Sequence, residues 1–246
     1  MTLSDYLKAA SRILIFTGAG VSTKSGIRDY RGPKGLWKTE QPVYYQEFMS
    51  DPAARNRYWQ QKLDSWPVIR DAVPTATHRA CVALEKVGKL LMVVTQNIDG
   101  LHRKAGTSLP LLVEIHGTTS RIECQSCHKQ YDPEPFFDEF AKTKQFPVCE
   151  CGGYLKPATI SFGQSLKQED LERAYEAAKR ADLVIALGST LSVTPAATIP
   201  LVAAERGIPY VIINSGPTDH DRLDVVSLRL DGDVDALFPP AVNSLS

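Results

Sequence analysis

The cysteines are the residues whose spacing most directly suggests chemistry. Four of the five occur in two close pairs, Cys124 and Cys127 in CQSC and Cys149 and Cys151 in CEC. Two close pairs separated by roughly twenty residues are typical of a four-thiolate structural zinc site. The sequence therefore predicts one zinc ion. The alternatives are two reduced, unrelated pairs, or disulfides in a secreted chain.

The second cysteine pair is one residue shorter than usual, so its turn must be tighter. Gly152 and Gly153 follow it directly and supply the backbone freedom for such a turn. His128 adjoins the first pair and is a possible substitute ligand, although a solvent-exposed histidine is the commoner interpretation. Cys81 lies in the helical pattern HRACVALEKV, and we expect it in the core.

Polar residues follow two of the apolar segments. Thr95-Gln96-Asn97-Ile98-Asp99 ends one such segment. Asparagine and aspartate at this position can form hydrogen bonds with ribose hydroxyls or with an amide. The alternative is that Asp99 caps a helix over 100–105. His116 ends the next segment, where an imidazole can act as a general base near neutral pH. A structural histidine is the alternative there.

Glycine-rich turns follow two further apolar segments. Gly18-Ala19-Gly20-Val21-Ser22 is expected to open a helix, because glycine lets a pyrophosphate approach the N–H groups of a helix N-terminus. Gly188-Ser189-Thr190 is a second such turn, and Asn214-Ser215 ends a third segment. Three polar strand ends at one edge of a sheet predict a dinucleotide site. The alternative is three ordinary turns.

The elements that must position these residues alternate between strands and helices. Expected strands are 12–17, 91–95, 111–115, 158–162, 182–189, 209–214 and, at an edge, 226–230. Expected helices are 76–87, 167–181, 195–206 and 233–238. Near-continuous apolar strands between helices indicate an α/β fold with a parallel sheet covered on both faces.

Two segments interrupt this alternation and predict a second, smaller module. The dinucleotide-binding domain is expected to be discontinuous, over 1–27, 76–117 and 158–246. Residues 28–75 are interpreted as a cofactor loop and helical insertion, and 118–157 as a zinc-binding module.

Composition excludes several other classes of protein. The chain has 246 residues, 43% of them hydrophobic, and 28 basic against 28 acidic residues. This balance is not that of a disordered chain, and it gives no general attraction to nucleic acid or an anionic membrane. No apolar run approaches the ~20 residues of a membrane span, and the N-terminus does not resemble a signal peptide. We expect a cytoplasmic monomer.

Taken together, the motifs resemble those of the sirtuin family, the NAD-dependent protein-lysine deacylases. The matches follow family order: GAGVSTKSGIRDYRGPKGLW (18–37), TQNIDGLH (95–102), HG (116–117), CQSC and CEC, SFG (161–163), GSTLSVTP (188–195) and IN (213–214). The resemblance implies a Rossmann-like sheet with helices on both faces, plus a small zinc-ribbon and helical module. It implies transfer of a lysine acyl group to NAD, which yields nicotinamide and O-acyl-ADP-ribose.

The resemblance also implies roles for individual residues. Catalytic positions would be His116 as the base, with Asn97 and Asp99. Cofactor positions would be Gly18, Ala19, Gly20, Ser22, Ile27, Asp29, Tyr30, Arg31, Trp37, Gln96, Asn97, Ile98, Asp99, Gly188, Ser189, Thr190, Asn214, Ser215, Asp233 and Val234. The acyl-lysine tunnel would be formed by Ile160, Phe162, Gly163 and Val193. The zinc on Cys124, Cys127, Cys149 and Cys151 would be structural.

The chain departs from the family pattern at several positions. Arg28 stands where proline is usual, which should loosen the cofactor loop or add a charge beside it. Gln164 replaces a usual glutamate. Residues 57–59 and 86–90 look closest to the class II, mitochondrial-type branch. Gln61 stands where the branch that removes succinyl and malonyl groups has arginine after Tyr58, so neutral acyl groups are expected.

Two other functions compete with deacylation. A mono-ADP-ribosyltransferase would use the same cofactor site but could dispense with His116. A non-enzymatic NAD-sensing or zinc-ribbon module would tolerate loss of Asn97, Asp99 or His116, and all three are intact. Acyl-lysine proteins or peptides are therefore the expected partners.

Overall fold

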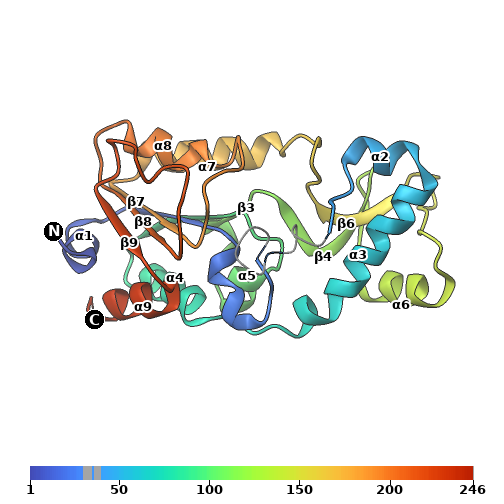
Figure 1. Ribbon diagram of the computed structural model, residues 1–246, viewed down its shortest axis with the longest axis horizontal. Coiled ribbons are helices and arrows are strands. Elements are labelled where there is room, and N and C mark those ends of the chain that lie inside the picture. Colours follow the sequence, from blue (N-terminus) through green and yellow to red (C-terminus); the bar gives the residue numbers. More distant parts are fainter. Residues whose placement is uncertain (30–34, 36–39, 246) are drawn as a thin grey trace.

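The computed structural model describes residues 1–29, 35 and 40–245, and the fold is given over these residues. Figure 1 shows an elongated molecule with a large parallel sheet at one end and a smaller group of helices and strands at the other. Within the described residues, no helix is long and apolar enough to cross a membrane.

The main sheet has six parallel strands in the order β3-β2-β1-β7-β8-β9. They are β1 (Ile13–Thr17), β2 (Leu90–Thr95), β3 (Leu112–Glu114), β7 (Leu183–Leu187), β8 (Tyr210–Asn214) and β9 (Leu228–Asp231). The chain builds outward from β1 to β2 and β3, and then in the other direction from β7 to β9. The strand order therefore reverses between β1 and β7, and open α/β sheets bind ligands at this point.

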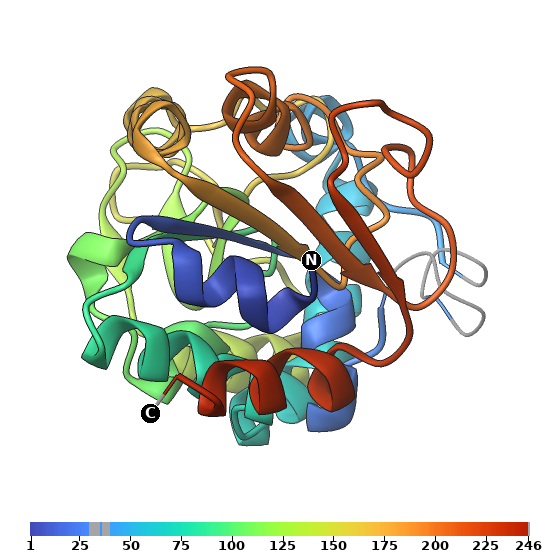
Figure 2. The ribbon, with the colours of Figure 1, turned by 90° about the vertical axis from the view of Figure 1, so that its left-hand side faces the viewer.

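Helices cover both faces of the main sheet (Figure 2). One face packs against α1 (Leu3–Ala9), α4 (Ala76–Lys86) and α9 (Val234–Asn243), and the other against α7 (Gln168–Arg180) and α8 (Thr198–Ala204). Along β1, Ile13 and Ile15 enter the first core, whereas Leu14 and Phe16 enter the second. Both faces of the strand are buried, which explains its unbroken apolar sequence.

Most of the elements expected from sequence are confirmed, including an edge strand at β9. The strand expected over 158–162 was assigned wrongly to the parallel sheet. It is β6 (Leu155–Thr159), in a separate sheet ordered β5-β4-β6 with β4 (Gly117–Cys124) and β5 (Gln130–Tyr131). Its ladder partner is antiparallel β4, with Glu123 opposite Lys156. β4 belongs to the segment that carries the first cysteine pair, far from β6 along the chain. The apolar sequence of β6 therefore predicts a buried strand but not which of the two sheets contains it.

The helix expected after β1 is also different in the structure. Two short 3₁₀ helices, η1 (Ala19–Val21) and η2 (Thr23–Ser25), follow the strand. The first ends at Ser22, and the second ends at Gly26 in the left-handed conformation (φ +83°). The turn after β1 therefore does not lead into the N-terminus of an α-helix. Any phosphate bound there would contact the backbone of the turn itself.

The small module consists of α2 (Tyr45–Ser50), α3 (Pro52–Asp71), α6 (Glu134–Thr143) and the three-stranded sheet (Figure 1). Asp51 caps α3 by accepting hydrogen bonds from two backbone N–H groups, and Pro52 occupies its first turn. Trp66 stacks on Phe137 at 4.7 Å, and Trp59 donates its indole N–H to Leu155 O at 3.0 Å. The helical insertion and the cysteine-bearing segment therefore share one aromatic core.

Candidate functional site

A cleft of about 1240 Å³ lies along the carboxyl ends of the main-sheet strands and continues to the small module. The turns after β1, β2, β7 and β8 all reach it, as the switch-point rule predicts. Residues of α3 and the chain after β6 line its other side. The cleft therefore collects segments that are far apart in the sequence.

Most of the predicted cofactor positions line this one cleft. They are Gly18, Ala19, Gly20, Ile27, Asp29, Gln96, Asn97, Ile98, Gly188, Ser189, Thr190, Asn214, Ser215, Asp233 and Val234. Ser22 and Asp99 are buried and do not line it. Tyr30, Arg31 and Trp37 lie outside the described residues.

Glycine is required where the turns after β1 and β7 meet. A Cβ at Gly20 would stand 2.7 Å from Gly188 Cα, and a Cβ at Gly188 would stand 2.7 Å from the backbone nitrogen of Val21. Gly188 also has a φ of +60°. The Gly20 N–H donates to Gly188 O at 2.8 Å and locks the two turns together. The result is a surface free of side chains, which suits a dinucleotide pyrophosphate.

The side chain of Asn97 is oriented by a buried network of hydrogen bonds. Its side-chain amide donates to Gly18 O and to Ser22 Oγ, both at 3.1 Å. The Ser22 hydroxyl in turn donates to Asp99 Oδ2 at 2.7 Å, and Asp99 Oδ1 accepts from Leu101 N at 2.8 Å. Asp99 thus supports α5 (Leu101–Ala105) and orients Asn97 through Ser22. Because both Asn97 amide hydrogens have acceptors, its carbonyl oxygen is the group available for a ligand.

His116 lies in the wall of the cleft, just after β3, with a defined tautomer. Its Nδ1 is 3.0 Å from the backbone oxygen of Gln96. Because a carbonyl oxygen can only accept, Nδ1 must carry a proton, and Nε2 of the neutral ring is the nitrogen that can take one up. The backbone of Gln96 is held in turn by β1, because its N–H donates to Thr17 O at 2.9 Å, and its side-chain amide donates to Ser189 Oγ at 2.8 Å. This arrangement leaves Nε2 as the ring nitrogen able to accept a proton.

The four residues predicted for the acyl-lysine tunnel also line the cleft. They are Ile160, Phe162, Gly163 and Val193. The Ile160 N–H donates to His116 O at 2.8 Å, so this wall is tied to the segment that carries the imidazole. The chain after β6 is held on its other side by α2, because Tyr45 N donates to Phe162 O at 2.9 Å. This part of the cleft wall is therefore fixed between the main sheet and the small module.

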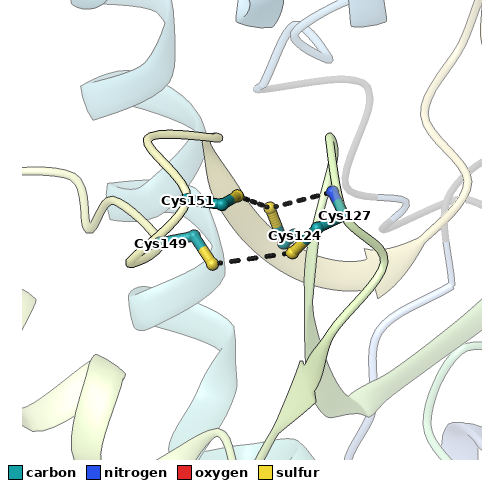
Figure 3. Close-up of side chains that lie close together, drawn as sticks. All are labelled: Cys124, Cys127, Cys149 and Cys151. Carbon is teal, nitrogen blue, oxygen red and sulfur yellow. Dashed lines mark hydrogen bonds between the residues drawn. The ribbon is translucent and has the colours of Figure 1, made fainter.

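The four paired cysteines converge in the small module (Figure 3). The sulfur of Cys124 is 3.5 Å from that of Cys151, and Cys127 Sγ is 3.8 Å from Cys149 Sγ. All four sulfurs lie within 4.8 Å of one another. Tetrahedral zinc with Zn–S bonds of ~2.3 Å requires sulfurs about 3.8 Å apart, whereas a disulfide bond is ~2.0 Å long. The cluster fits zinc, and disulfides are excluded.

The short second cysteine pair is accommodated by its glycines, as the sequence predicted. Gly152 has a φ of +82°, and a Cβ on Gly153 would lie 2.6 Å from Cys124 Sγ. The Tyr131 hydroxyl lies 3.1 Å from Cys149 Sγ, and its hydrogen bond lowers the pKa of that thiol to about 6. His128 is exposed and stands outside the sulfur cluster. Four thiols are therefore available as zinc ligands without a histidine ligand.

Two lysines and two histidines near the site were not identified from the sequence. Lys62 lines the cleft, and Lys156 is fully buried in the small module. His78 and His102 are buried with their ring centres 4.6 Å apart, and His102 Nε2 is 3.0 Å from Thr17 Oγ1 at the end of β1. Lysine is mostly exposed in proteins and histidine is intermediate, so residue type alone does not separate these four from exposed ones. Cys81, by contrast, is buried in the core as expected, and burial raises its pKa to about 12.

The doubly wound sheet, the glycine cradle and the histidine beside an apolar wall define a dinucleotide-dependent α/β enzyme with a separate four-cysteine metal site. The chain belongs to the Sir2 family, whose family model matches residues 18–195.

Similar proteins cover nearly the whole chain. The NAD-dependent protein deacetylase of Rhodopseudomonas palustris is 41% identical over 230 residues, which is 93% of this chain and 91% of the relative. That of Thermodesulfovibrio yellowstonii is 38% identical over 88% of this chain and 84% of its own length. A solved Sir2 structure with a deacetylated p53 peptide and 3′-O-acetyl ADP ribose superimposes with a TM-score of 0.86 at 32% identity, and the match covers 100% of this chain and 99% of that one.

Proposed function

We infer that this protein is an NAD-dependent protein-lysine deacylase that removes acetyl groups. The observation that carries this conclusion is the position of His116, with its Nδ1 proton directed at Gln96 O, in the same cleft as the glycine cradle. NAD bound in the cleft supplies the ribose that accepts the acyl group, and nicotinamide is the leaving group. Overall, acyl-lysine, NAD and one water give lysine, nicotinamide and O-acyl-ADP-ribose.

We propose that the cradle at Gly18, Gly20 and Gly188 holds the pyrophosphate through backbone groups. Asn97, oriented by Gly18 O and Ser22, would present its carbonyl oxygen toward the nicotinamide end. Ser189 and Asn214, at the ends of β7 and β8, would contact the adenosine side. These roles assign the cofactor a direction along the cleft, from the turn after β2 to the ends of β8 and β9.

In the proposed reaction His116 removes a proton from a ribose hydroxyl through Nε2. Gln96 O would then accept a hydrogen bond from Nδ1 of the imidazolium and stabilise the new charge. The wall formed by Ile160, Phe162 and Val193 would keep bulk water from the reacting acyl group. A positioned base of this kind contributes ~10²–10⁴ in rate.

Acyl-lysine peptides are the proposed substrates. Solved relatives hold a p53 peptide in one case and a propionylated peptide in another. In this chain, Gln46 donates to Gly163 O at 3.0 Å, so α2 braces the backbone edge along which a peptide would lie. We propose that the substrate chain enters between this edge and Val193.

Zinc has a structural role in this proposal. None of the four cysteines lines the cleft in the part of the chain that the structure describes. Bound zinc would join the end of β4 to the loop before β6 and so hold the small-module wall of the cleft. We also propose the domain division expected from sequence, with the main sheet binding NAD and the two insertions forming the smaller module.

Several finer assignments rest on sequence alone and remain proposals. Residues 57–59 and 86–90 are the support for the class II, mitochondrial-type branch. A cytoplasmic, monomeric protein is also proposed. Equal numbers of basic and acidic residues support the absence of a general attraction to nucleic acid or to anionic membranes.

The deciding experiment is product analysis with an acetyl-lysine peptide and NAD. Mass spectrometry should show equal amounts of deacetylated peptide, nicotinamide and O-acetyl-ADP-ribose. His116→Ala should abolish this turnover, whereas the matched control His128→Ala, at an exposed histidine, should retain it. A peptide that gains ADP-ribose and keeps its acetyl group would instead establish a mono-ADP-ribosyltransferase.

A further inference from the structure

The segment that follows β8, at one end of the cleft, is held by the side chain of Arg229. This residue lies on β9, the edge strand beside β8 (Figure 1), and pairs with Ile212. Its neighbours Leu228 and Leu230 pack against one core of the main sheet, so the Arg229 side chain projects from the other face, as Ile212 does. Only 21% of this side chain is exposed. Its guanidinium group therefore needs partners within the protein.

The guanidinium group of Arg229 binds the backbone at the end of β8. Its Nη1 donates to Asn214 O at 3.1 Å and to Leu230 O, and its Nη2 donates to Gly216 O. Its Nε donates to Asp221 Oδ1 at 2.7 Å, and this carboxylate supplies the counter-charge. In the described chain Arg229 does not itself line the cleft. It is therefore suited to shape the site rather than to bind a cofactor phosphate.

The same contacts fix the side chain of Asn214, which lines the cleft. Its Nδ2 donates to Ser215 O at 3.3 Å and to Gly216 O at 3.1 Å. Gly216 O is thus shared by Asn214 and Arg229, and Gly216 N donates in turn to Asp231 Oδ1 at 2.9 Å. Because both partners of the amide are carbonyl oxygens, its nitrogen must face them, and Oδ1 is left for a ligand.

An amide oxygen that is fixed in this way selects a ligand that donates a hydrogen bond. Oδ1 can only accept, and the adenosine ribose of NAD offers hydroxyl donors. Without the guanidinium group, Gly216 O would lose one of its partners, and the Asn214 amide would be free to turn its nitrogen toward the cleft. A binding group that is held in its bound orientation loses less conformational entropy when the ligand arrives.

The remainder of the segment after β8 has anchors of its own. Asp219 N donates to Thr190 O at 3.0 Å, and Thr190 lines the cleft in the turn after β7. The Tyr210 hydroxyl is 3.0 Å from Nδ1 of the buried His220. These contacts do not involve Arg229. Replacement of the arginine should therefore relax the end of β8 and leave the rest of the segment folded.

We propose that Arg229 is a positioning residue for the cofactor: by holding Gly216 O, it fixes the carbonyl oxygen of Asn214 as the acceptor for a hydroxyl of the adenosine ribose. This inference rests on the proposed function, in which the ends of β7 and β8 receive the adenosine side of NAD. Arg229 takes no part in bond making. Its replacement should weaken NAD binding and leave the chemical step unchanged.

Steady-state kinetics with an acetyl-lysine peptide separates this role from a general loss of structure. The variants are Arg229→Met, Arg229→Lys, which keeps a positive charge but lacks the planar fork, and the control Arg222→Met, at an exposed arginine of the same segment. Both Arg229 variants should raise the KM for NAD by about 3–10-fold, the effect of about one hydrogen bond. Their kcat and their KM for the peptide should stay within about twofold of the natural values, because only cofactor binding is changed. Arg222→Met should match the natural enzyme.

A binding cycle tests the link to the ribose directly and needs no turnover. Calorimetry gives the Kd of ADP-ribose and of its analogue that lacks both hydroxyls of the adenosine ribose. In the natural protein, loss of the hydroxyls should weaken binding by about 10-fold. In Arg229→Met the same loss should weaken binding by less than about 3-fold, because the acceptor is no longer fixed. Arg229→Lys gives the same comparison if Arg229→Met does not fold.

Two results would overturn the role of Arg229. One is a KM for NAD that the Arg229 variants leave unchanged. The other is an equal effect of the missing hydroxyls in the natural protein and in the variants. If no peptide is turned over, the proposed deacylase function fails, and the binding cycle still decides the role of Arg229. A natural protein that does not bind ADP-ribose would overturn both.

Discussion

The buried pair of histidines, His78 and His102, should make the free energy of unfolding sensitive to mild acid. His78 is 0% exposed and His102 is 1% exposed. The Thr75 N–H donates to His78 Nδ1 at 3.2 Å, so Nδ1 is an acceptor and the neutral ring carries its proton on Nε2. Within the described chain, neither His78 Nε2 nor His102 Nδ1 has a hydrogen-bond partner. A second proton on either ring would therefore create a buried, poorly solvated charge.

The size of the effect follows from the pKa of His78. Burial lowers this pKa from 6.5 to about 4, against the opposing attraction of Asp99. The unfolded chain takes up the proton near pH 6.5, so the neutral ring stabilises the fold fully above that pH and less as the pH falls toward 4. The full difference of 6.5 − 4 = 2.5 pKa units is worth about 3 kcal/mol, of which about 2 kcal/mol is lost by pH 5. Burial also lowers the pKa of His102, which acts in the same direction.

The measurement is the free energy of unfolding in urea at pH 7.5 and pH 5.0, with zinc present. We compare the natural chain with His78→Gln and with the control His128→Gln, at an exposed histidine. Carboxylates and cysteines are common to all three proteins, so their contributions cancel in the comparison. The loss of stability between the two pH values should be about 2 kcal/mol smaller in His78→Gln than in the control. Equal losses in the two variants would refute the argument from desolvation.

Three further predictions concern zinc, the base and the glycine cradle. Purified protein should contain one zinc per chain, and Cys124→Ala should lose the metal and unfold 118–157 in hydrogen exchange; a zinc-free native protein would contradict this. His116→Ala should lower deacetylation by ~10²–10⁴ while calorimetry shows NAD binding retained, and near-normal turnover would exclude the assigned role. Gly188→Ala should weaken NAD binding and cost ~1–3 kcal/mol in thermal unfolding, because of the Val21 contact and the φ of +60°; an unchanged variant would disprove the packing argument.

Those features of the site that depend on local order along the chain could be predicted from sequence. Apolar segments of about five residues define β1, β7 and β8, and the glycine or polar residues at their ends occupy the cleft because parallel strands end at one sheet edge. The cysteine spacing predicted a metal site, but only the sulfur positions excluded disulfides. His116 could be proposed as a base from its place after a strand, whereas its tautomer depends on Gln96 O.

Tertiary structure alone decided the partners of each element and the environment of each charge. The apolar sequence near residue 158 is compatible with a buried strand in either sheet. Its pairing with β4 joins segments that are far apart along the chain, so the local sequence does not predict it. Lys62 lies on a helix of mixed polarity, where a lysine is ordinarily solvated, and only the tertiary structure places it partly buried in the wall of the cleft beside Tyr58. His78 is likewise inconspicuous in sequence. The sequence determined which groups occur at the strand ends, but burial, which sets their pKa values and electrostatic interactions, arises only when distant segments exclude water from them together.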